Sequence, residues 1–253
     1  TNNNPLQSFL LHKCNYEYSI GRKDCDILID SKSISRKHCT IKLLPETNSL
    51  VIQDFSKFGT FIKRESEKER IVDGIRIDLP PPVSNNQLLI WFGPQSLPFT
   101  LMRMNFSFSF SGIPTDLKKS YASLCFESLG IEVVNQWSNC CTHLLMKTIS
   151  LSEKVILALL DCKPIISINW ITEINSTNLS INNSLLNWNE EWLPELDELF
   201  STPSTTPTFI TKNLFLPNPK RSKIFTNFVF LFFDSLREEK MNRIIQYANG
   251  ISL

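Results

Sequence analysis

The sequence predicts a multidomain protein: an all-β sandwich, then an α/β domain with a parallel sheet flanked by helices, then the beginning of a second α/β unit. Short apolar runs separated by turn residues fill 6–104, and strand and helix patterns alternate over 105–178. A strand-and-helix pattern recurs over 223–253 but is too short to complete a sheet. Between them, 179–222 is rich in Asn, Ser, Thr and Pro and is predicted to be a linker.

The composition favours a folded protein and argues against two classes of partner. Of 253 residues, 42% are hydrophobic, and 26 basic and 25 acidic residues give a formal net charge of +1. This even balance argues against strong direct DNA binding, which needs clustered basic residues. The longest apolar run, 228–233, is far too short to span a membrane. We therefore expect a soluble protein with no membrane partner.

Seven cysteines, most of them within apolar runs, are interpreted as buried, reduced thiols of an intracellular protein. Cys140, Cys141 and His143 lie close together in the sequence, so a metal site or a thiol nucleophile is an alternative. Structural zinc needs four ligands at recognisable spacing, and these three supply no second pair. The pattern therefore favours a protein with no metal, no cofactor and no catalytic residue.

The first hundred residues consist of short apolar or alternating runs of strand length, and no run of helical period intervenes. The expected strands are 18–20, 27–29, 39–44, 50–52, 60–62, 71–77, 87–92 and 99–102. Loops that cluster at one end of a rigid sandwich are where recognition usually occurs. The turns between these strands are therefore the expected place for a binding site.

Three of these turns carry the polar residues of a candidate anion site: Gly21-Arg22, Ser35-Arg36-Lys37-His38, and Ser56-Lys57-Phe58-Gly59-Thr60. An arginine can bind two phosphate oxygens with its planar fork, while hydroxyl and backbone N–H groups take the remaining oxygens. Plainer interpretations stay open at each position. Arg22 can be an ordinary exposed charge, Ser35 can close a turn, and His38 can satisfy a buried carbonyl.

Taken together, the three motifs resemble the forkhead-associated (FHA) domain, with its Gly-Arg, Ser-x-x-His and Gly-Thr pattern. The resemblance implies a phosphothreonine pocket formed by Arg22, Ser35, Arg36, Lys37, Lys57, Gly59 and Thr60, and supported by Gly21, His38 and Phe58. The usual FHA pattern has Asn where Phe58 stands, and that amide contacts the peptide backbone. Selection of the residues beside the phosphothreonine is therefore expected to differ from the common pattern.

The middle of the chain alternates strands with helices. Strands are expected at 106–110, 131–134, 143–146 and 164–168, with helices capped by Thr115, capped by Ser150, and beginning at Asn169. With Cys141-Thr142-His143-Leu144-Leu145-Met146 and a core Trp170, this order resembles a BRCT domain. Ser111, Gly112 and Lys154 form a second candidate phosphate site, because a hydroxyl, a backbone N–H and an ammonium converge near a helix start. The alternative for Lys154 is a solvated helix face.

The pairing of these two domains resembles the FHA–BRCT subunit of the complex that senses and processes DNA double-strand breaks. Further matches are Val133-Val134-Asn135-Gln136-Trp137 and Lys163-Pro164-Ile165, and an aromatic at Phe58 is typical of that family. The resemblance implies a nuclear, non-enzymatic adaptor that binds phosphorylated Ser-Asp-Thr-type peptides of DNA-damage mediator and end-resection proteins. Contacts with nuclease and ATPase subunits would use regions outside this sequence, which looks like a fragment. The alternative is an FHA/BRCT signalling scaffold in another nuclear pathway.

Overall fold

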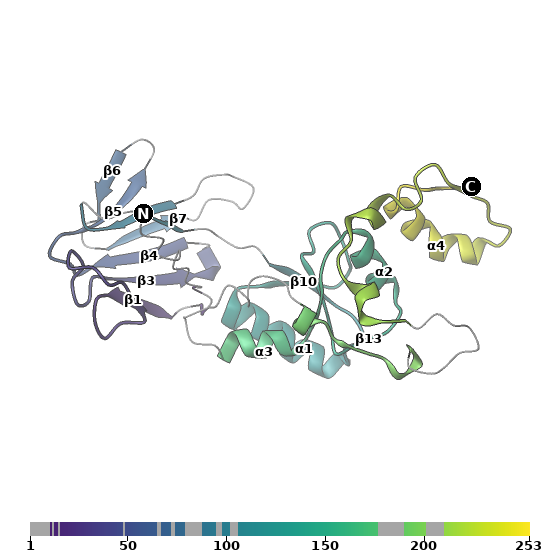
Figure 1. Cartoon of the computed structure of the whole chain (residues 1–253), viewed down its shortest axis with the longest axis horizontal. Coiled ribbons are helices and arrows are strands. Elements are labelled where there is room, and N and C mark those ends of the chain that lie inside the picture. The colour runs from purple at the N-terminus through teal and green to yellow at the C-terminus, as the bar shows by residue number, and fades with distance from the viewer. Residues whose placement is uncertain are drawn as a thin grey trace. The chain divides into compact units, whose positions relative to one another are not determined.

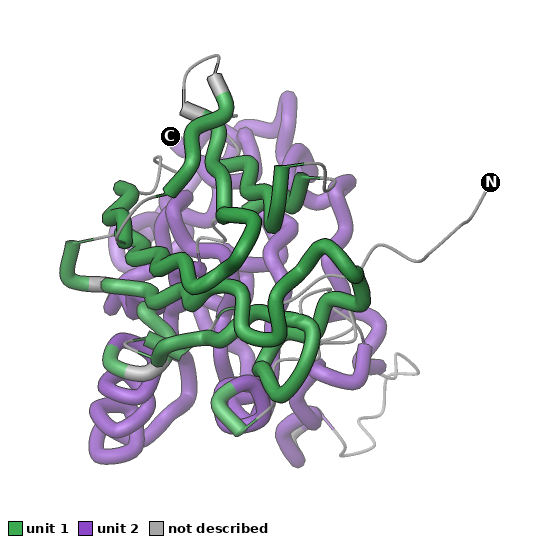
Figure 2. Tube along the Cα trace, turned by 90° about the vertical axis from the view of Figure 1, so that its left-hand side faces the viewer, with its two compact units in different colours: residues 1–105, 127–130, 175–183 green, residues 106–126, 131–174, 184–253 purple. Residues whose placement is uncertain are grey.

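The chain divides into two compact units, shown in different colours in Figure 2. The computed structural model describes residues 11, 13–14, 16–47, 49–64, 67–71, 74–78, 88–94, 98–101, 106–176, 190–200 and 210–253. Within these ranges, every helix is too short or too polar to cross a lipid bilayer.

The first unit is built from two β-sheets (Figure 1). One sheet has the order β2-β1-β3-β4-β7, with β1 at Glu17–Gly21, β2 at Ile27–Leu28, β3 at Cys39–Leu44, β4 at Ser49–Asp54 and β7 at Ile75–Asp78. The other has the order β6-β5-β8-β9, with β5 at Thr60–Arg64, β6 at Glu67–Arg70, β8 at Leu88–Phe92 and β9 at Phe99–Leu101. Strand β2 runs parallel to β1, and the other pairs are antiparallel. A 3-10 turn, η1 (Pro45–Thr47), joins β3 to β4.

The two sheets share one apolar core, so the predicted all-β sandwich is confirmed. Ile20, Ile41 and Ile52 from the first sheet join Ile62 and Ile90 from the second in one cluster of buried side chains. Their neighbours along each strand point the other way, because side chains alternate between the two faces of a strand. The core therefore fixes the register of the strands, and with it the ends from which the loops emerge.

One predicted strand was wrong in its extent. The run 71–77 was expected to be a single strand, but β6 ends at Arg70 and β7 begins at Ile75. Gly74 has a φ of +81°, a left-handed conformation that interrupts an extended run. Strand β6 itself was missed because all four of its residues are charged, as suits the edge of a sheet but gives no apolar alternation.

The second unit begins with a four-stranded, wholly parallel sheet of order β11-β10-β12-β14, which confirms the predicted α/β domain. Its strands are β10 (Ser107–Phe110), β11 (Glu132–Val134), β12 (His143–Met146) and β14 (Ile165–Ser167). Its helices are α1 (Thr115–Ser123), which continues as a π-helical turn η2 (Leu124–Ser128), α2 (Glu153–Leu160) and α3 (Asn169–Ser176). Figure 1 shows α1 and α3 on one side of this sheet and α2 on the other.

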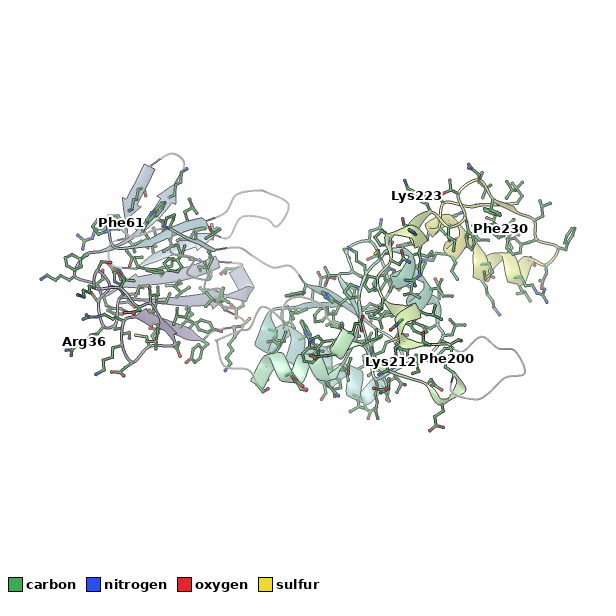
Figure 3. The ribbon with its side chains drawn as sticks, viewed as in Figure 1. Arg36, Phe61, Phe200, Lys212, Lys223 and Phe230 are labelled. Atoms are coloured by element: carbon green, nitrogen blue, oxygen red, sulfur yellow. The ribbon has the colours of Figure 1, made fainter. Side chains whose placement is uncertain are left out.

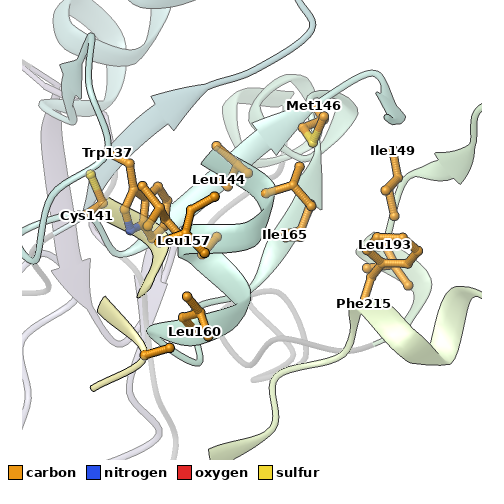
Figure 4. Packing of buried hydrophobic residues seen from close by; sticks show 14 residues of the cluster. Trp137, Cys141, Leu144, Met146, Ile149, Leu157, Leu160, Ile165, Leu193 and Phe215 are labelled. Carbon is orange, nitrogen blue, oxygen red and sulfur yellow. The ribbon is translucent and has the colours of Figure 1, made fainter. Parts of the chain in front are cut away.

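Each face of this sheet is covered by a different set of apolar side chains. Leu144, Met146 and Ile165 lie in one cluster with Leu157 of α2 (Figure 4). On the other face, Trp170 of α3 packs edge-on against Phe108, with ring centroids 5.7 Å apart, and stacks on His143 at 6.0 Å. Trp170 is 4% exposed, so the expectation that it is a core residue is confirmed.

Two helix starts lie elsewhere than predicted. The residue that caps α1 is Pro114, not Thr115, and its side chain makes no capping hydrogen bond. Helix α2 is capped by Ser152 rather than Ser150: the Val155 backbone N–H donates to the Ser152 hydroxyl oxygen. Both Ser150 and Ser152 are good capping residues; Ser150 directly follows β13 (Thr148–Ile149), and Ser152 is the one that directly precedes the helix.

Part of the segment predicted to be a linker contributes to the core of the second unit. Leu193 and Phe215 are each 5% exposed and belong to the cluster around α2 (Figure 4). The ordered elements are η3 (Glu190–Trp192), β15 (Glu195–Leu196), η4 (Glu198–Phe200), η5 (Lys212–Phe215) and η6 (Pro219–Lys223), with β15 parallel to β13. The Ser/Thr/Pro-rich stretch 201–207 lies outside the described residues.

The strand and helix at the end of the sequence are present and rest on the second unit. Strand β16 (Val229–Phe230) pairs in parallel with β17 (Ile251–Ser252), and α4 (Ser235–Tyr247) lies between them in sequence. The predicted strand at 228–233 is therefore only two residues long. Ile244 of α4 and the adjoining Ala248 enter the core cluster beside α2, and Arg243 forms an ion pair with Glu153 at 2.9 Å.

Burial of His143 should make the stability of the second unit depend on pH. Burial, with Lys163 nearby, lowers the pKa of His143 to about 4, against about 6.5 in an unfolded chain. The neutral form is the one that fits the core. The stability that the neutral His143 ring contributes to the folded unit is therefore fully present above pH 6.5. It is lost as pH falls towards 4, which lowers the free energy of unfolding by on the order of 3 kcal/mol.

We expect His143→Phe to flatten this pH dependence of the free energy of unfolding. The measurement is denaturant unfolding of both proteins between pH 4 and 8, with the difference between the two curves isolating the histidine. Parallel curves over this range would contradict the prediction.

Candidate functional site

Backbone hydrogen bonds join the first two predicted loops of the site. The Arg22 N–H donates to the carbonyl of Ser35 at 3.0 Å, and the Lys23 N–H donates to the carbonyl of Arg36 at 3.2 Å. Arg22 directly follows β1, and Ser35 to Lys37 lead into β3, which is the antiparallel neighbour of β1. The pairing of these strands therefore brings the guanidinium of Arg22 to the same rim as Ser35, Arg36 and Lys37.

Gly21 is required because this approach is so close. A Cβ atom on Gly21 would lie 2.0 Å from the Arg36 carbonyl oxygen and 2.8 Å from Sγ of Cys25. The Cys25 thiol in turn donates to the carbonyl oxygens of Lys23 and Arg36, at 3.3 and 3.2 Å. The predicted supporting role of Gly21 thus has a physical basis: the absence of a side chain lets the two loops touch.

His38 joins the second loop to the third. Its imidazole is fully buried; the Ser35 N–H donates to Nδ1 at 3.2 Å, and Nε2 lies 3.3 Å from the Gly59 carbonyl oxygen. Since Nδ1 accepts, Nε2 must carry the proton that is donated to Gly59. Burial lowers the pKa of His38, although the bond to the Gly59 carbonyl and the charge of Asp54 act the other way. The neutral ring is therefore a fixed strut between two loops.

The third loop is shaped by the carboxylate of Asp54, which lies outside the three motif segments. Asp54 accepts from the Ser56 N–H at 3.1 Å and from the Thr60 hydroxyl at 2.9 Å. The Ser56 hydroxyl accepts from the Gly59 N–H at 2.7 Å, which closes the turn. Asp often begins a turn by accepting a hydrogen bond from the backbone N–H of the residue two positions later. The sequence Asp54-Phe55-Ser56 fits this turn signal, so Asp54 could have been found from the sequence.

A single hydrogen bond then ties the third loop to the second. The Lys57 N–H donates to the Ser35 hydroxyl oxygen at 3.1 Å. Ser35 still has its own hydroxyl proton, which this bond does not use and which can serve a ligand. All three motif segments therefore meet at one rim of the sandwich, as the sequence predicted.

Cationic side chains project from this rim. Arg22, Arg36, Lys37 and Lys57 are exposed, and Figure 3 shows Arg36 on the outside of the unit. None of the described carboxylates forms an ion pair with the Arg22 guanidinium. The ammonium of Lys37 lies 4.8 Å from the centroid of the Phe55 ring, and that of Lys57 lies 5.7 Å from the Phe58 ring. Such contacts hold a flexible cation in place while leaving its charge towards solvent.

The structure assigns some predicted residues to different roles. Gly59 and Thr60 were expected to contact a ligand; both are buried, and their polar groups bond to other residues of the domain. In the structure they shape the pocket, and their direct contact with a ligand stays a prediction. Phe58 was expected to support it, yet its ring is 47% exposed at the rim.

The second candidate phosphate site is not open. The ammonium of Lys154 donates to the Ser109 hydroxyl at 3.1 Å, to the Phe110 carbonyl at 2.9 Å and to the Asn135 carbonyl, which uses all three of its protons. The Ser111 hydroxyl bonds to that of Ser152 at 3.0 Å. Burial and nearby Lys118 lower the pKa of Lys154. Lys154 therefore ties the sheet together in this structure and does not lie on a solvated helix face, while phosphate binding by Ser111, Gly112 and Lys154 stays a prediction.

The Cys/His alternative gains no support from the geometry. Across the described ranges, no three His, Cys, Asp or Glu side chains converge as metal ligands, and all seven cysteines are free thiols. Cys140 is exposed, Cys141 is buried, and Nδ1 of His143 bonds to the Thr142 hydroxyl at 3.0 Å. Burial raises the pKa of the Cys141 thiol, which disfavours the nucleophilic thiolate.

Comparison with known proteins agrees with this architecture. The FHA domain family model matches residues 18–95, and the BRCA1 C-terminus (BRCT) domain model matches 104–175. The chain therefore carries an FHA domain followed by a BRCT domain. Among proteins with these two domains, it is similar to nibrin.

Nibrins of two vertebrates show this similarity over most of the chain. Nibrin of Danio rerio is 26% identical over 238 residues, which is 93% of this chain and 26% of the relative. Nibrin of Gallus gallus is 28% identical over 248 residues, 92% of this chain and 30% of the relative. The chain thus spans less than a third of the length of these proteins. The solved FHA-BRCT1-BRCT2 domains of S. pombe Nbs1 share the fold, with a TM-score of 0.64, 18% identity, and coverage of 98% of this chain and 77% of that one.

We expect Gly21→Ala to destabilise the first unit. The added methyl group collides with the Arg36 carbonyl, so the loop must move or the strand must bend, at about 2 kcal/mol or more. Urea unfolding and amide hydrogen exchange of β1 and β3 measure this cost. Lys23→Ala, an exposed neighbour on the same loop, is the control and should change stability by less than about 0.5 kcal/mol. Equal effects of the two changes would contradict the account of Gly21.

We expect Lys154→Met to destabilise the second unit by about 2 to 4 kcal/mol, because it leaves one hydroxyl and two carbonyl groups without their donor. Lys119→Met, an exposed position on α1, should be nearly neutral. Thermal or urea unfolding distinguishes the two. A Lys154→Met protein as stable as wild type would show that these hydrogen bonds do not hold the sheet.

Proposed function

We propose that this protein is a non-enzymatic adaptor that binds phosphothreonine peptides through its FHA pocket and recruits phosphorylated partners to damaged DNA. FHA and BRCT domains are non-catalytic interaction modules, and nibrin similarity supports a role in DNA double-strand-break repair. The observation that carries the proposal is the rim at which Arg22 and Ser35 lie together, with a guanidinium that no described carboxylate neutralises.

The chemistry of this rim suits a phosphate dianion. A phosphothreonine brings a charge of about −1.5 to −2 and three acceptor oxygens. Arg22 supplies a planar pair of N–H donors, Ser35 a hydroxyl proton, and Arg36, Lys37 and Lys57 further positive charge. An unphosphorylated threonine offers none of these contacts, so binding would be switched on by a kinase.

The wider role follows from the same similarity. A solved structure contains S. pombe Nbs1 in complex with Ctp1, so a relative with this fold binds a partner protein. For this chain we propose partners of the same general kind: DNA-damage mediator and end-resection proteins bearing phosphorylated Ser-Asp-Thr-type motifs, encountered in the nucleus. Nuclease and ATPase subunits of the repair complex would be bound through other regions of the full protein.

Arg22→Ala should weaken binding of a phosphothreonine peptide by about 2 to 4 kcal/mol, because a charge-assisted, two-pronged contact with the phosphate is lost. Arg22→Lys should be intermediate, since the charge remains without the fork. The measurement is a calorimetric titration with paired phosphorylated and unphosphorylated acidic Ser-Asp-Thr peptides.

Lys240→Ala, which removes one exposed charge from α4 in the second unit, is the matched control and should leave the affinity unchanged. Circular dichroism should show the same fold in every variant. Unchanged affinity of Arg22→Ala for the phosphorylated peptide, or equal affinity of wild type for both peptides, would rule out the proposed function.

A further inference from the structure

A third arginine lies beside the site, on the charged edge strand β6. Arg70 is the last residue of β6 and pairs with Phe61 of β5, which is labelled in Figure 3. The next N–H along the chain, that of Ile71, donates to the Thr60 carbonyl at 2.8 Å. Strand β6 therefore ends beside the Gly59–Thr60 end of β5, where the third loop of the pocket ends.

The Arg70 side chain lies directly against Gly59. A Cβ atom on Gly59 would be 2.6 Å from Nε of Arg70 and 3.2 Å from its Cδ and Cζ atoms. Gly59 also has a φ of +88°, which favours glycine on conformational grounds. Its missing side chain thus has two consequences: it allows the turn, and it makes room for a guanidinium at the edge of the pocket.

This guanidinium is available to a ligand. The Arg70 side chain is exposed and forms no hydrogen bond or ion pair with any residue in the described ranges. Its strand neighbour differs: the Lys68 ammonium donates to the Pro94 carbonyl at 2.8 Å and lies over the rings of Phe61 and Trp91, at 5.0 and 4.7 Å. Lys68 and Arg70 lie on the same face of β6. The Lys68 ammonium is bound within the domain, whereas the Arg70 guanidinium is not bound to any described residue.

The adjoining turn offers little else to an acidic peptide on this side. The Ser56 hydroxyl and both backbone polar groups of Gly59 bond within the domain, and the exposed ring of Phe58 has no hydrogen-bonding group. A peptide held at Arg22 and Ser35 that extends past this turn meets Arg70. Its planar fork suits a carboxylate or phosphate oxygen pair.

We propose that Arg70 is a specificity-determining residue that binds an anionic side chain next to the phosphothreonine. This rests on the proposed function of the same pocket. The ligand is therefore a phosphothreonine peptide with a second negative group, either an acidic residue or another phosphorylated residue, on the side of the peptide that faces β6.

The test uses peptides whose only charged side chains are one phosphothreonine and one Asp. The Asp is placed in turn at each of the three positions before and the three positions after the phosphothreonine. Matched peptides have Asn or phosphoserine at the same position, which separates a carboxylate from a second phosphate. We expect wild type to prefer an anionic group at one or two adjacent positions, and Arg70→Gln to lose that preference, roughly tenfold, while keeping its affinity for the Asn peptide. Arg70→Lys should retain part of it.

Lys63→Gln is the matched control. It removes the same charge from the same face, two residues along β5 from Phe61, or about 7 Å. If Lys63→Gln lowers the preference as much as Arg70→Gln does, the effect is general charge attraction and the assignment of Arg70 is wrong. An unchanged preference in Arg70→Gln overturns it as well. Failure of the pocket itself would be recognised separately, as loss of the difference between phosphorylated and unphosphorylated peptides in wild type.

Discussion

The buried imidazole of His38 is the contact on which the candidate site depends. It accepts the Ser35 N–H and donates to the Gly59 carbonyl, so two loops that are 21 residues or more apart are held at a fixed separation. Because burial favours the neutral ring, each nitrogen keeps one role, acceptor or donor. The hydroxyl of Ser35 and the exposed cations are placed by this arrangement rather than by contacts of their own.

The division of labour in the pocket follows from how its polar groups are satisfied. The side chains of Asp54, Ser56 and Thr60 form their hydrogen bonds at the third loop. These bonds matter because backbone polar groups left without partners in a turn would destabilise the domain. Besides the Ser35 hydroxyl, the side chains at this rim that the fold does not use are those of Arg22, Arg36, Lys37, Lys57 and Arg70. All of them are cations, so the surplus at this rim is positive although the chain as a whole is nearly neutral.

The second unit shows the opposite outcome for the same residue types. Lys154 lies at the start of a helix, where an anion would be favoured, but three acceptors from β10 and the residue after β11 occupy its ammonium. Apolar contacts from the expected linker, Leu193 and Phe215, and from α4 complete the core around α2. The unit is thus held together by segments distant in sequence, and its polar groups are largely used in doing so.

By itself the sequence determined both fold classes and the three motif segments of the site. Alternating apolar residues specify strands, and Gly-Arg, Ser-x-x-His and Gly-Thr lie in turns that such strands must place at one end. The sequence also identified Phe58, Gly59 and Thr60 as residues of the site. It did not show which of the three is exposed to solvent. That depended on hydrogen bonds to Asp54 and His38, which join residues from different strands. The surroundings of the Arg70 and Lys154 side chains, and therefore their roles, were determined by tertiary structure alone. An arginine on a charged edge strand and a lysine on a helix carry no local signal of their neighbours, and only folding determines whether an acceptor lies within reach of each.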